Sequence, residues 1–289
     1  MIARRQRCAR IIMYHGIPEK HAAGFRAQMH YFVRNFRVIS LGKMVWDLVK
    51  RGDPGPPKIV LTFDDGLRNN LTVVYPVLRE LSIPATFFVC PGLLEDGRWL
   101  WNHEARCRLQ TLSEAQFAAF TAHLGLACGS VENAVEWMKT LPNAQRVRAE
   151  QLIRRSTRGF VPTHEQRQTY EIMDWEQLRS LDPRLVTIGS HTLTHPILTG
   201  LDDHQIELEL VESRRLLEQR LQRPVEYFCY PNGSHDQRVQ RAVARHYAAA
   251  VTTESGIVGE RDHDLHLLPR IPGADDLAVM AWRLHRPGA

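Results

Sequence analysis

Short apolar runs alternate with amphipathic segments along most of this chain, and that alternation limits the folds it can adopt. The runs lie at residues 58–63, 85–89, 185–188, 225–228 and 248–251. Apolar runs of this length are typical of buried strands. Strands that alternate with helices form a parallel sheet, which is either open or closed into a barrel.

The segments between the runs have the spacing of helices that pack one face on a core. The segment before the break at residues 82–84 carries Val74, Val77, Leu78 and Leu81. Another follows a short predicted strand at residues 38–40 and carries Leu41, Val45, Leu48 and Val49. A third is predicted to begin at Asp202, because Gln205 has the spacing of a capping box. Its apolar face comprises Ile206, Leu210, Leu217 and Leu221.

The alternation stops between about residues 97 and 170. This stretch contains helix formers, three tryptophans and a basic patch at residues 146–158, but no clear strand. We interpret it as a helical insertion on one face of the sheet. The 289 residues then fit a single domain over residues 1–289, because α/β barrels of roughly 250 residues are common.

The charge balance and the cysteines bear on partners and compartment. The chain has 37 Lys and Arg against 32 Asp and Glu, a net charge of +5. This surplus is too small to predict a nucleic-acid partner, but it favours acidic glycans or peripheral contact with anionic lipid.

The basic start is followed by too short an apolar run for a signal peptide, and no stretch is long enough to span a bilayer. Five cysteines without a CxxC pair favour a reducing compartment. We therefore expect a cytoplasmic protein, or a periplasmic or exported one if the true start lies upstream.

The first of two polar motifs is TFDDG at residues 62–66, directly at the end of a predicted strand. Adjacent carboxylates repel each other and are costly to bury unless a positive group lies beside them. A divalent metal meets that need, with one carboxylate as a ligand and the other free to act as a base. Gly66 permits the sharp turn that such an arrangement requires.

The second motif is GSHTLTHP at residues 189–196, in which His191 and His195 have the spacing of metal ligands. Each motif alone has a more ordinary explanation, because a DDG sequence is usually a loop and paired histidines are often structural. Both follow strands, however, and parallel-sheet folds place active sites at the carboxyl ends of strands. One carboxylate and two imidazoles leave positions open for water and substrate, which indicates a catalytic metal site.

Together these motifs resemble those of the polysaccharide deacetylase family, also called the NodB-homology or carbohydrate esterase 4 family. Residues 14–17 (YHGI) resemble the start of one branch of that family. Residues 228–233 (FCYPNG) and 268–271 (LPRI) resemble two of its later motifs. The resemblance extends from about residue 11 to residue 271, and it implies a distorted (β/α)7-8 barrel.

The resemblance also implies roles for individual residues. Asp65, His191 and His195 would bind the metal, and Asp64 would be the general base that activates the metal-bound water. The backbone N–H of Asn232 would stabilise the oxyanion. Zn2+ is the default metal for such a ligand set, with Co2+ or Ni2+ as alternatives.

Two features of the family are missing, and each has a candidate replacement. Most members carry an Arg, which orients the catalytic Asp, where Cys229 stands here, and Arg270 is the candidate for that role. The late L-x-H motif that supplies the general acid has no clear match, and the YHGI start implies that His15 donates the proton instead. The plainer alternatives are a strand-end His15 bonded to backbone and an Arg270 paired with a surface carboxylate.

Four further residues are candidates for contact with the substrate, namely Tyr230, Pro231, Trp101 and His103. The first two belong to the FCYPNG motif. Trp101 would either stack on a sugar ring or pack in the core of the insertion. His103 lies in a polar cluster that we expect at the mouth of the site.

The resemblance thus implies a metal-dependent hydrolase that removes N-acetyl groups from an N-acetylhexosamine-containing glycan or glycolipid precursor. The second hypothesis is a deformylase or amidase that acts on another non-peptide C–N bond, such as that of a lipid-linked amino sugar. A non-catalytic glycan-binding module is a weaker alternative, because the base and all three metal ligands are present together. The sequence does not indicate an oligomeric state.

Overall fold

Seven parallel strands close into a barrel in the computed structural model, which describes residues 8–50, 55–126, 129–259 and 264–285. The barrel strands are β1 (Ala9–Tyr14), β3 (Lys58–Phe63), β4 (Ala85–Val89), β5 (Val186–Ser190), β6 (Tyr227–Cys229), β7 (Ala249–Ser255) and β8 (Leu268–Pro272). They are ordered β1-β8-β7-β6-β5-β4-β3, and pairing of β1 with β3 closes the ring. A short strand, β2 (Arg37–Val38), pairs with the start of β3. The expected (β/α)7-8 barrel with a helical insertion is confirmed, and the ring has seven strands.

The strands predicted at residues 58–63 and 85–89 have the bounds that the sequence indicates. Every residue of β3 and β4 is buried, as expected for strands that have the barrel interior on one face and helices on the other. The predicted strand at residues 225–228 shifts to Tyr227–Cys229, and the one at residues 38–40 shortens to β2.

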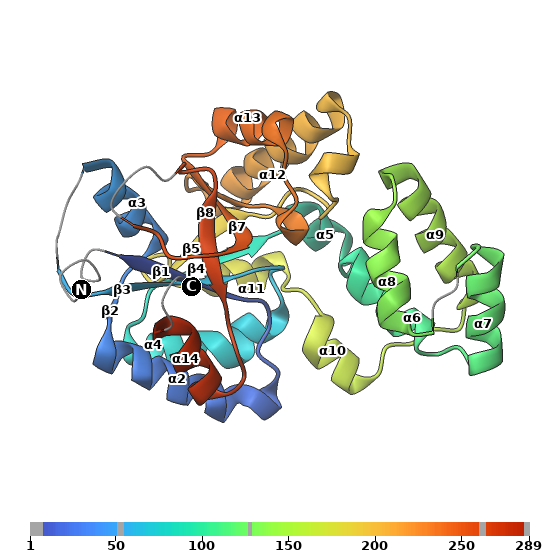
Figure 1. The fold of residues 1–289 in the computed structure, drawn as a ribbon, viewed down its shortest axis with the longest axis horizontal. Helices are drawn as coiled ribbons and strands as arrows, with labels where there is room; N and C mark the ends of the chain where they lie inside the picture. The colour runs from blue at the N-terminus through green and yellow to red at the C-terminus, as the bar shows by residue number, and fades with distance from the viewer. Residues whose placement is uncertain (1–7, 51–54, 127–128, 260–263, 286–289) are drawn as a thin grey trace.

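Helices cover the outside of the barrel, as Figure 1 shows. The α-helices are α2 (Ala22–Asn35), α3 (Leu41–Lys50), α4 (Tyr75–Leu81), α5 (Pro91–Asp96), α11 (Trp175–Ser180), α12 (Asp203–Leu221), α13 (Gln237–His246) and α14 (Leu277–His285). Single-turn helices lie at Glu19–His21, Leu198–Gly200 and Pro231–Gly233, and a π-helical turn at Asn70–Val74 precedes α4.

Two helix predictions have different outcomes. The capping box at Asp202 and Gln205 is present, and α12 begins at the next residue. Val49, by contrast, does not lie on the buried face of α3, because its exposed fraction is 58 %. At 3.6 residues per turn, Val49 falls at the edge of the stripe formed by Leu41 and Val45.

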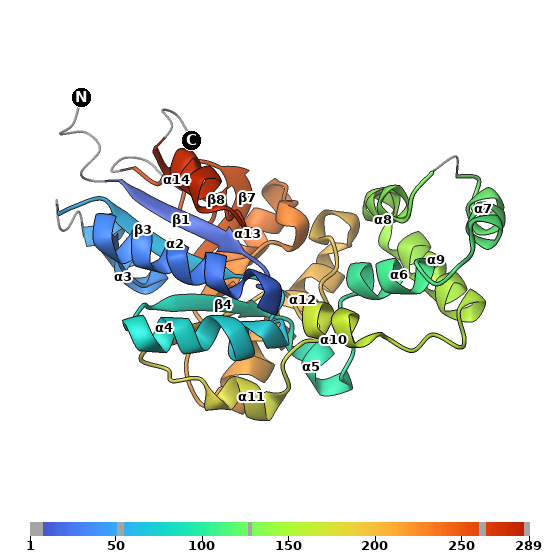
Figure 2. The same cartoon turned by 90° about the horizontal axis from the view of Figure 1, so that it is seen from below.

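The insertion consists of five helices: α6 (Trp101–Leu109), α7 (Glu114–His123), α8 (Val131–Thr140), α9 (Asn143–Ser156) and α10 (His164–Tyr170). Helices α6 to α9 lie together on one side of the barrel, and α10 lies between them and the barrel (Figures 1 and 2). Helices α6 to α9 have a hydrophobic core of their own that includes Val135, Met138 and Ile153. The insertion is therefore a packed unit attached to the barrel.

Within the described residues, no helix combines the length and apolar character that a membrane crossing requires. The basic start of the chain at residues 1–7 and Cys128 lie outside the described residues. Cys90, Cys107 and Cys229 are buried and form no disulfide.

Candidate active site

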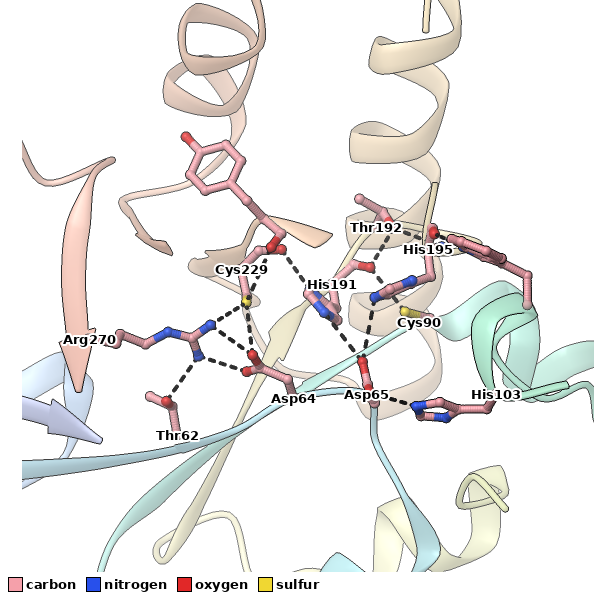
Figure 3. A network of polar contacts seen from close by, with 12 residues as sticks. Thr62, Asp64, Asp65, Cys90, His103, His191, Thr192, His195, Cys229 and Arg270 are labelled. Carbon is pink, nitrogen blue, oxygen red and sulfur yellow. Dashed lines mark hydrogen bonds and ion pairs between the residues drawn. The ribbon is translucent and has the colours of Figure 1, made fainter. Parts of the chain in front are cut away.

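The two acidic residues of the DDG motif follow β3 and point to different partners. The backbone N–H of Asp64 donates to the carbonyl of Tyr14 at 2.9 Å, which extends the pairing of β3 with β1. Asp65 then has a φ of 73° and Gly66 a φ of 64°, so the chain turns sharply. A Cβ on Gly66 would lie 2.9 Å from Val89 Cγ1. This turn directs Asp64 toward Arg270 and Asp65 toward the histidines (Figure 3).

Asp65, His191 and His195 form a buried cluster at the carboxyl ends of β3 and β5. Asp65 Oδ1 lies 3.5 Å from the Nε2 atom of each histidine. The candidate ligand atoms of the three residues all lie within 4.8 Å of one another. Two imidazole nitrogens and one carboxylate oxygen are the donor set of many catalytic Zn2+ sites, so the residues present fit a divalent metal.

The two histidines are held by different contacts. His191 Nδ1 donates to the carbonyl of Cys229 at 2.7 Å, which leaves its Nε2 atom directed at Asp65. The backbone N–H of His195 donates to Thr192 Oγ1 at 2.9 Å. His195 Nδ1 has no hydrogen-bond partner among the described residues, and the Nε2 atoms of both histidines face Asp65.

Burial and charge act differently on the ionisation of these groups. Burial lowers the pKa of His195 to about 3, so its ring is neutral and able to bind a metal. Burial also lowers the pKa of His191, but nearby groups that include Asp65 outweigh it and raise that pKa well above its ordinary value. A metal would therefore displace a proton from His191 on binding.

Glu209 of α12 holds the loop between the two histidines. Its Oε2 atom accepts hydrogen bonds from the backbone N–H groups of Leu193 and Thr194 at 2.8 and 2.9 Å. Its Oε1 atom accepts a third from Thr194 Oγ1 at 2.6 Å. Sequence reasoning missed this residue, although a Glu on the buried face of an amphipathic helix beside Leu210 is a signal that could have found it.

Arg270 of β8 is fully buried and binds Asp64 through both ends of its guanidinium. Nη1 lies 2.8 Å from Asp64 Oδ1, and Nη2 lies 2.7 Å from Oδ2. Cys229 lies beside the pair, with its Sγ atom 3.3 Å from Arg270 Nη2. Burial raises the pKa of Asp64, but Arg270 outweighs that effect and lowers it below its ordinary value. The alternative of a surface ion pair for Arg270 is therefore wrong.

His15 and Asn232 lie at the same edge of the barrel. His15 directly follows β1, whose Tyr14 is paired with Phe63 at the end of β3. It is exposed, and it lies close enough to both carboxylates that a positive charge on it would lower the pKa of each. Asn232 is exposed in the turn after β6, with a left-handed φ of 57°. Both residues are thus accessible to a ligand.

Three of the four residues predicted to contact the substrate have buried side chains. Tyr230 is fully buried and donates its hydroxyl to the carbonyl of His266 at 3.0 Å. Pro231 is also buried. Trp101 packs in the core of the insertion, and its Nε1 atom donates to the carbonyl of His195 at 3.1 Å. The hydroxyl of Tyr230 and the indole N–H of Trp101 are thus bonded to backbone carbonyls.

The fourth, His103, does reach the cluster. Its Nε2 atom lies 3.8 Å from Asp65 Oδ2. The residue is 9 % exposed.

Comparison with known proteins agrees with this geometry. The family profile described as "Polysaccharide deacetylase" matches residues 51–251. A Bacillus subtilis (strain 168) protein, YxkH, which is provisionally named a polysaccharide deacetylase, is 21 % identical over 285 residues. That alignment covers 94 % of this chain and 75 % of the relative.

Solved structures share the fold. The Streptococcus pyogenes deacetylase PplD, solved in complex with acetate, matches with a TM-score of 0.65 and 17 % identity, covering 96 % of this chain and 99 % of its own. IcaB from Ammonifex degensii matches with a TM-score of 0.63 and 16 % identity, covering 96 % of this chain and 97 % of its own. The chain therefore belongs to the polysaccharide deacetylase family, whose members are hydrolases that deacetylate glycans at carbon–nitrogen bonds other than peptide bonds.

Proposed function

We propose that this protein is a metal-dependent hydrolase that removes N-acetyl groups from an N-acetylhexosamine in a glycan or glycolipid precursor. One observation carries the proposal: a three-residue metal-ligand cluster lies beside a carboxylate that is held separately by a buried arginine. The three-residue cluster would bind the metal. The carboxylate held by the arginine would be the base, because it is not needed as a metal ligand.

Asp65, His191 and His195 would hold the metal, with Zn2+ as the default for these donors. A divalent metal at such a site polarises a carbonyl oxygen and makes water a better nucleophile. The remaining chemistry belongs to the side chains of this chain.

Asp64 would take the proton from the attacking water. Its two hydrogen bonds with Arg270 fix the plane of the carboxylate, and the lowered pKa keeps it ionised. A proton acceptor in a defined position lowers the barrier more than a mobile one.

Two exposed groups complete the site. The backbone N–H of Asn232 would donate to the oxyanion that forms as water attacks, a contact whose loss typically costs about 3–4 kcal/mol in the barrier. His15 would donate a proton to the leaving amine, since it lies at the end of the strand beside Asp64. Amine and acetate are the products.

The test combines metal analysis with acetate release. Protein purified without a chelator should contain one equivalent of metal and release acetate from N-acetylglucosamine oligomers. Asp64→Asn should retain the metal and lose activity, whereas His191→Ala should lose both. Full activity in Asp64→Asn would contradict the assignment of the base, and glycan binding without acetate release would contradict the enzyme.

A further inference from the structure

The exit of the helical insertion is hydrogen-bonded to the loop that carries Asp65, and its entry lies beside the metal-ligand cluster. On the exit side, the backbone N–H of Met173 donates to the carbonyl of Gly66 at 2.9 Å. The N–H of Arg68 donates to the carbonyl of Glu171 at 2.7 Å. On the entry side, the first turn of α6 lies against the metal-ligand cluster. The insertion is therefore anchored at the site itself.

His103, in the first turn of α6, faces one specific atom of the cluster. The two carboxylate oxygens of Asp65 have different neighbours, because Oδ1 faces His191 and His195 at 3.5 Å. Oδ2 faces His103 Nε2 at 3.8 Å instead. Figure 3 shows His103 approaching Asp65 from the side opposite His191.

The ring of His103 is held in place by packing. It lies against Tyr170 of α10, with ring centroids 4.7 Å apart and planes inclined by 39°. Its Nδ1 atom has no hydrogen-bond partner among the described residues. A neutral imidazole carries a single N–H, on one of its two nitrogens. If the proton is on Nε2, that N–H points at Asp65, and the unpaired Nδ1 carries no proton.

The same turn of α6 also contacts a second ligand. Trp101 Nε1 donates to the carbonyl of His195 at 3.1 Å. The guanidinium of Arg146 from α9 lies over the Trp101 ring, 4.7 Å from its centroid. The core of the insertion is thereby connected to His195 through Trp101 and to Asp65 through His103.

We propose that His103 is a positioning residue for the metal site, whose Nε2–H donates to Asp65 Oδ2 and so leaves Oδ1 for the metal. The proposal rests on the metal site of the proposed function. A hydrogen bond of about 2.9 Å requires the two groups to approach by roughly 1 Å from their present separation. Partners of this kind orient ligands and typically change metal affinity about 10–100-fold when they are removed.

The test compares His103→Leu with His103→Gln, because Gln restores an N–H donor and Leu does not. Zn2+ affinity is measured by competition with a chromophoric chelator, and the melting temperature of the metal-free proteins is measured alongside. We expect His103→Leu to bind Zn2+ about 10–100-fold more weakly and His103→Gln to remain close to wild type. His123→Leu, an exposed histidine on α7, is the matched control and should bind as wild type does.

Co2+ spectra separate positioning from direct ligation. An unchanged Co2+ spectrum in His103→Gln supports positioning, because the ligand set is then intact. A spectrum that shows a lost nitrogen ligand overturns the proposal in favour of His103 as a ligand. Equal Zn2+ affinity of wild type and His103→Leu also overturns it but leaves the proposed function standing. A wild-type protein that binds no metal overturns both.

Discussion

Arg270 and Asp64 form a doubly hydrogen-bonded ion pair in which Arg270 is fully buried and the Asp64 side chain is 2 % exposed. The two N–O distances are 2.8 and 2.7 Å, and Nε of Arg270 donates to the carbonyl of Thr252 at 2.7 Å. Asp64 directly follows β3 and Arg270 lies in β8, and these two strands lie on either side of β1 in the barrel. The guanidinium thus reaches Asp64 from the last strand, and the residue on β6 beside it is Cys229 rather than an arginine.

This geometry predicts that Arg270→Met is costly to both stability and activity. Removal of one partner leaves a buried carboxylate unpaired, which typically costs about 3–5 kcal/mol in the free energy of unfolding. Burial would then raise the pKa of Asp64, and the protonated carboxyl cannot accept a proton. Urea denaturation and acetate release measure the two effects.

Arg270→Lys separates the effect of the positive charge from the effect of the two hydrogen bonds to Asp64. Lys keeps the positive charge but cannot form two parallel hydrogen bonds with a carboxylate. We expect it to recover part of the stability and little of the activity. Arg184→Met, which breaks an exposed pair with Asp182, is the control and should change neither. Wild-type activity in Arg270→Lys would show that fixing the carboxylate plane is unimportant.

The contacts of Glu209 predict an effect on metal binding without a change of ligand. Glu209→Ala removes three hydrogen bonds to the loop between His191 and His195, so we expect Zn2+ affinity to fall about tenfold or more. Glu212→Ala is the control, because that residue pairs with Arg215 on the solvent side of the same helix. Equal affinities of the two variants, measured by chelator competition, would contradict the role of Glu209.

Glu209 also predicts a dependence of stability on pH. Burial raises its pKa above the ordinary 4.5, although hydrogen bonds from Thr194 and Leu193 lower it. The folded protein therefore keeps this proton at pH values where the unfolded chain has released it. The contribution of Glu209 to stability then falls as the pH rises from the unfolded pKa through the folded one.

Glu209→Gln isolates that contribution, because the amide does not ionise. The free energy of unfolding of the variant, relative to wild type, should increase as the pH rises above about 4.5 and then level off. Urea denaturation of both metal-free proteins across this range measures the difference. A difference that stays constant or decreases with pH would show that the pKa of Glu209 is not raised.

Features that depend on local spacing could be predicted from the sequence, and features that depend on distant contacts could not. Two adjacent carboxylates after β3 and two histidines four residues apart after β5 lie together because parallel strands end at the same edge of the barrel, where only β4 separates the two. Arg270 was expected only because the resemblance required an arginine that position 229 lacks. No local pattern relates Glu209 to Thr194, which another element contributes.

The errors have the same origin. A sequence motif does not specify how deeply a side chain is buried, so Tyr230 was expected to face a ligand although its hydroxyl bonds to the carbonyl of His266. Trp101 could stack on a sugar or pack in the core, and its hydrogen bond to the carbonyl of His195 and the packing of Arg146 over its ring distinguish the two environments. Such contacts depend on how helices of the insertion pack, which periodicity does not determine.

Trp101→Phe tests whether the insertion stabilises the loop that carries His191 and His195. Phe keeps most of the packing but leaves the carbonyl of His195 without its donor, and a buried unpaired group typically costs about 1–3 kcal/mol. We expect lower stability and weaker Zn2+ binding. Trp137→Phe, in the same hydrophobic core, controls for the loss of ring size. Equal Zn2+ affinity in the two variants would mean that the hydrogen bond to His195 is unimportant for the metal.

His15→Ala tests whether His15 is the general acid, by comparing a substrate whose leaving group needs a proton with one whose leaving group does not. An amine must be protonated as the C–N bond breaks, so loss of the acid should reduce kcat for an N-acetyl amide about 10²–10⁴-fold. An aryl acetate releases a phenolate that needs no proton, so its hydrolysis should fall much less. Metal content should stay at the wild-type level, because His15 is not one of the three residues in the cluster. His164→Ala, an exposed histidine at the start of α10, is the control. Equal losses on amide and ester would assign His15 to substrate binding or structure, because only a proton donor distinguishes the two leaving groups.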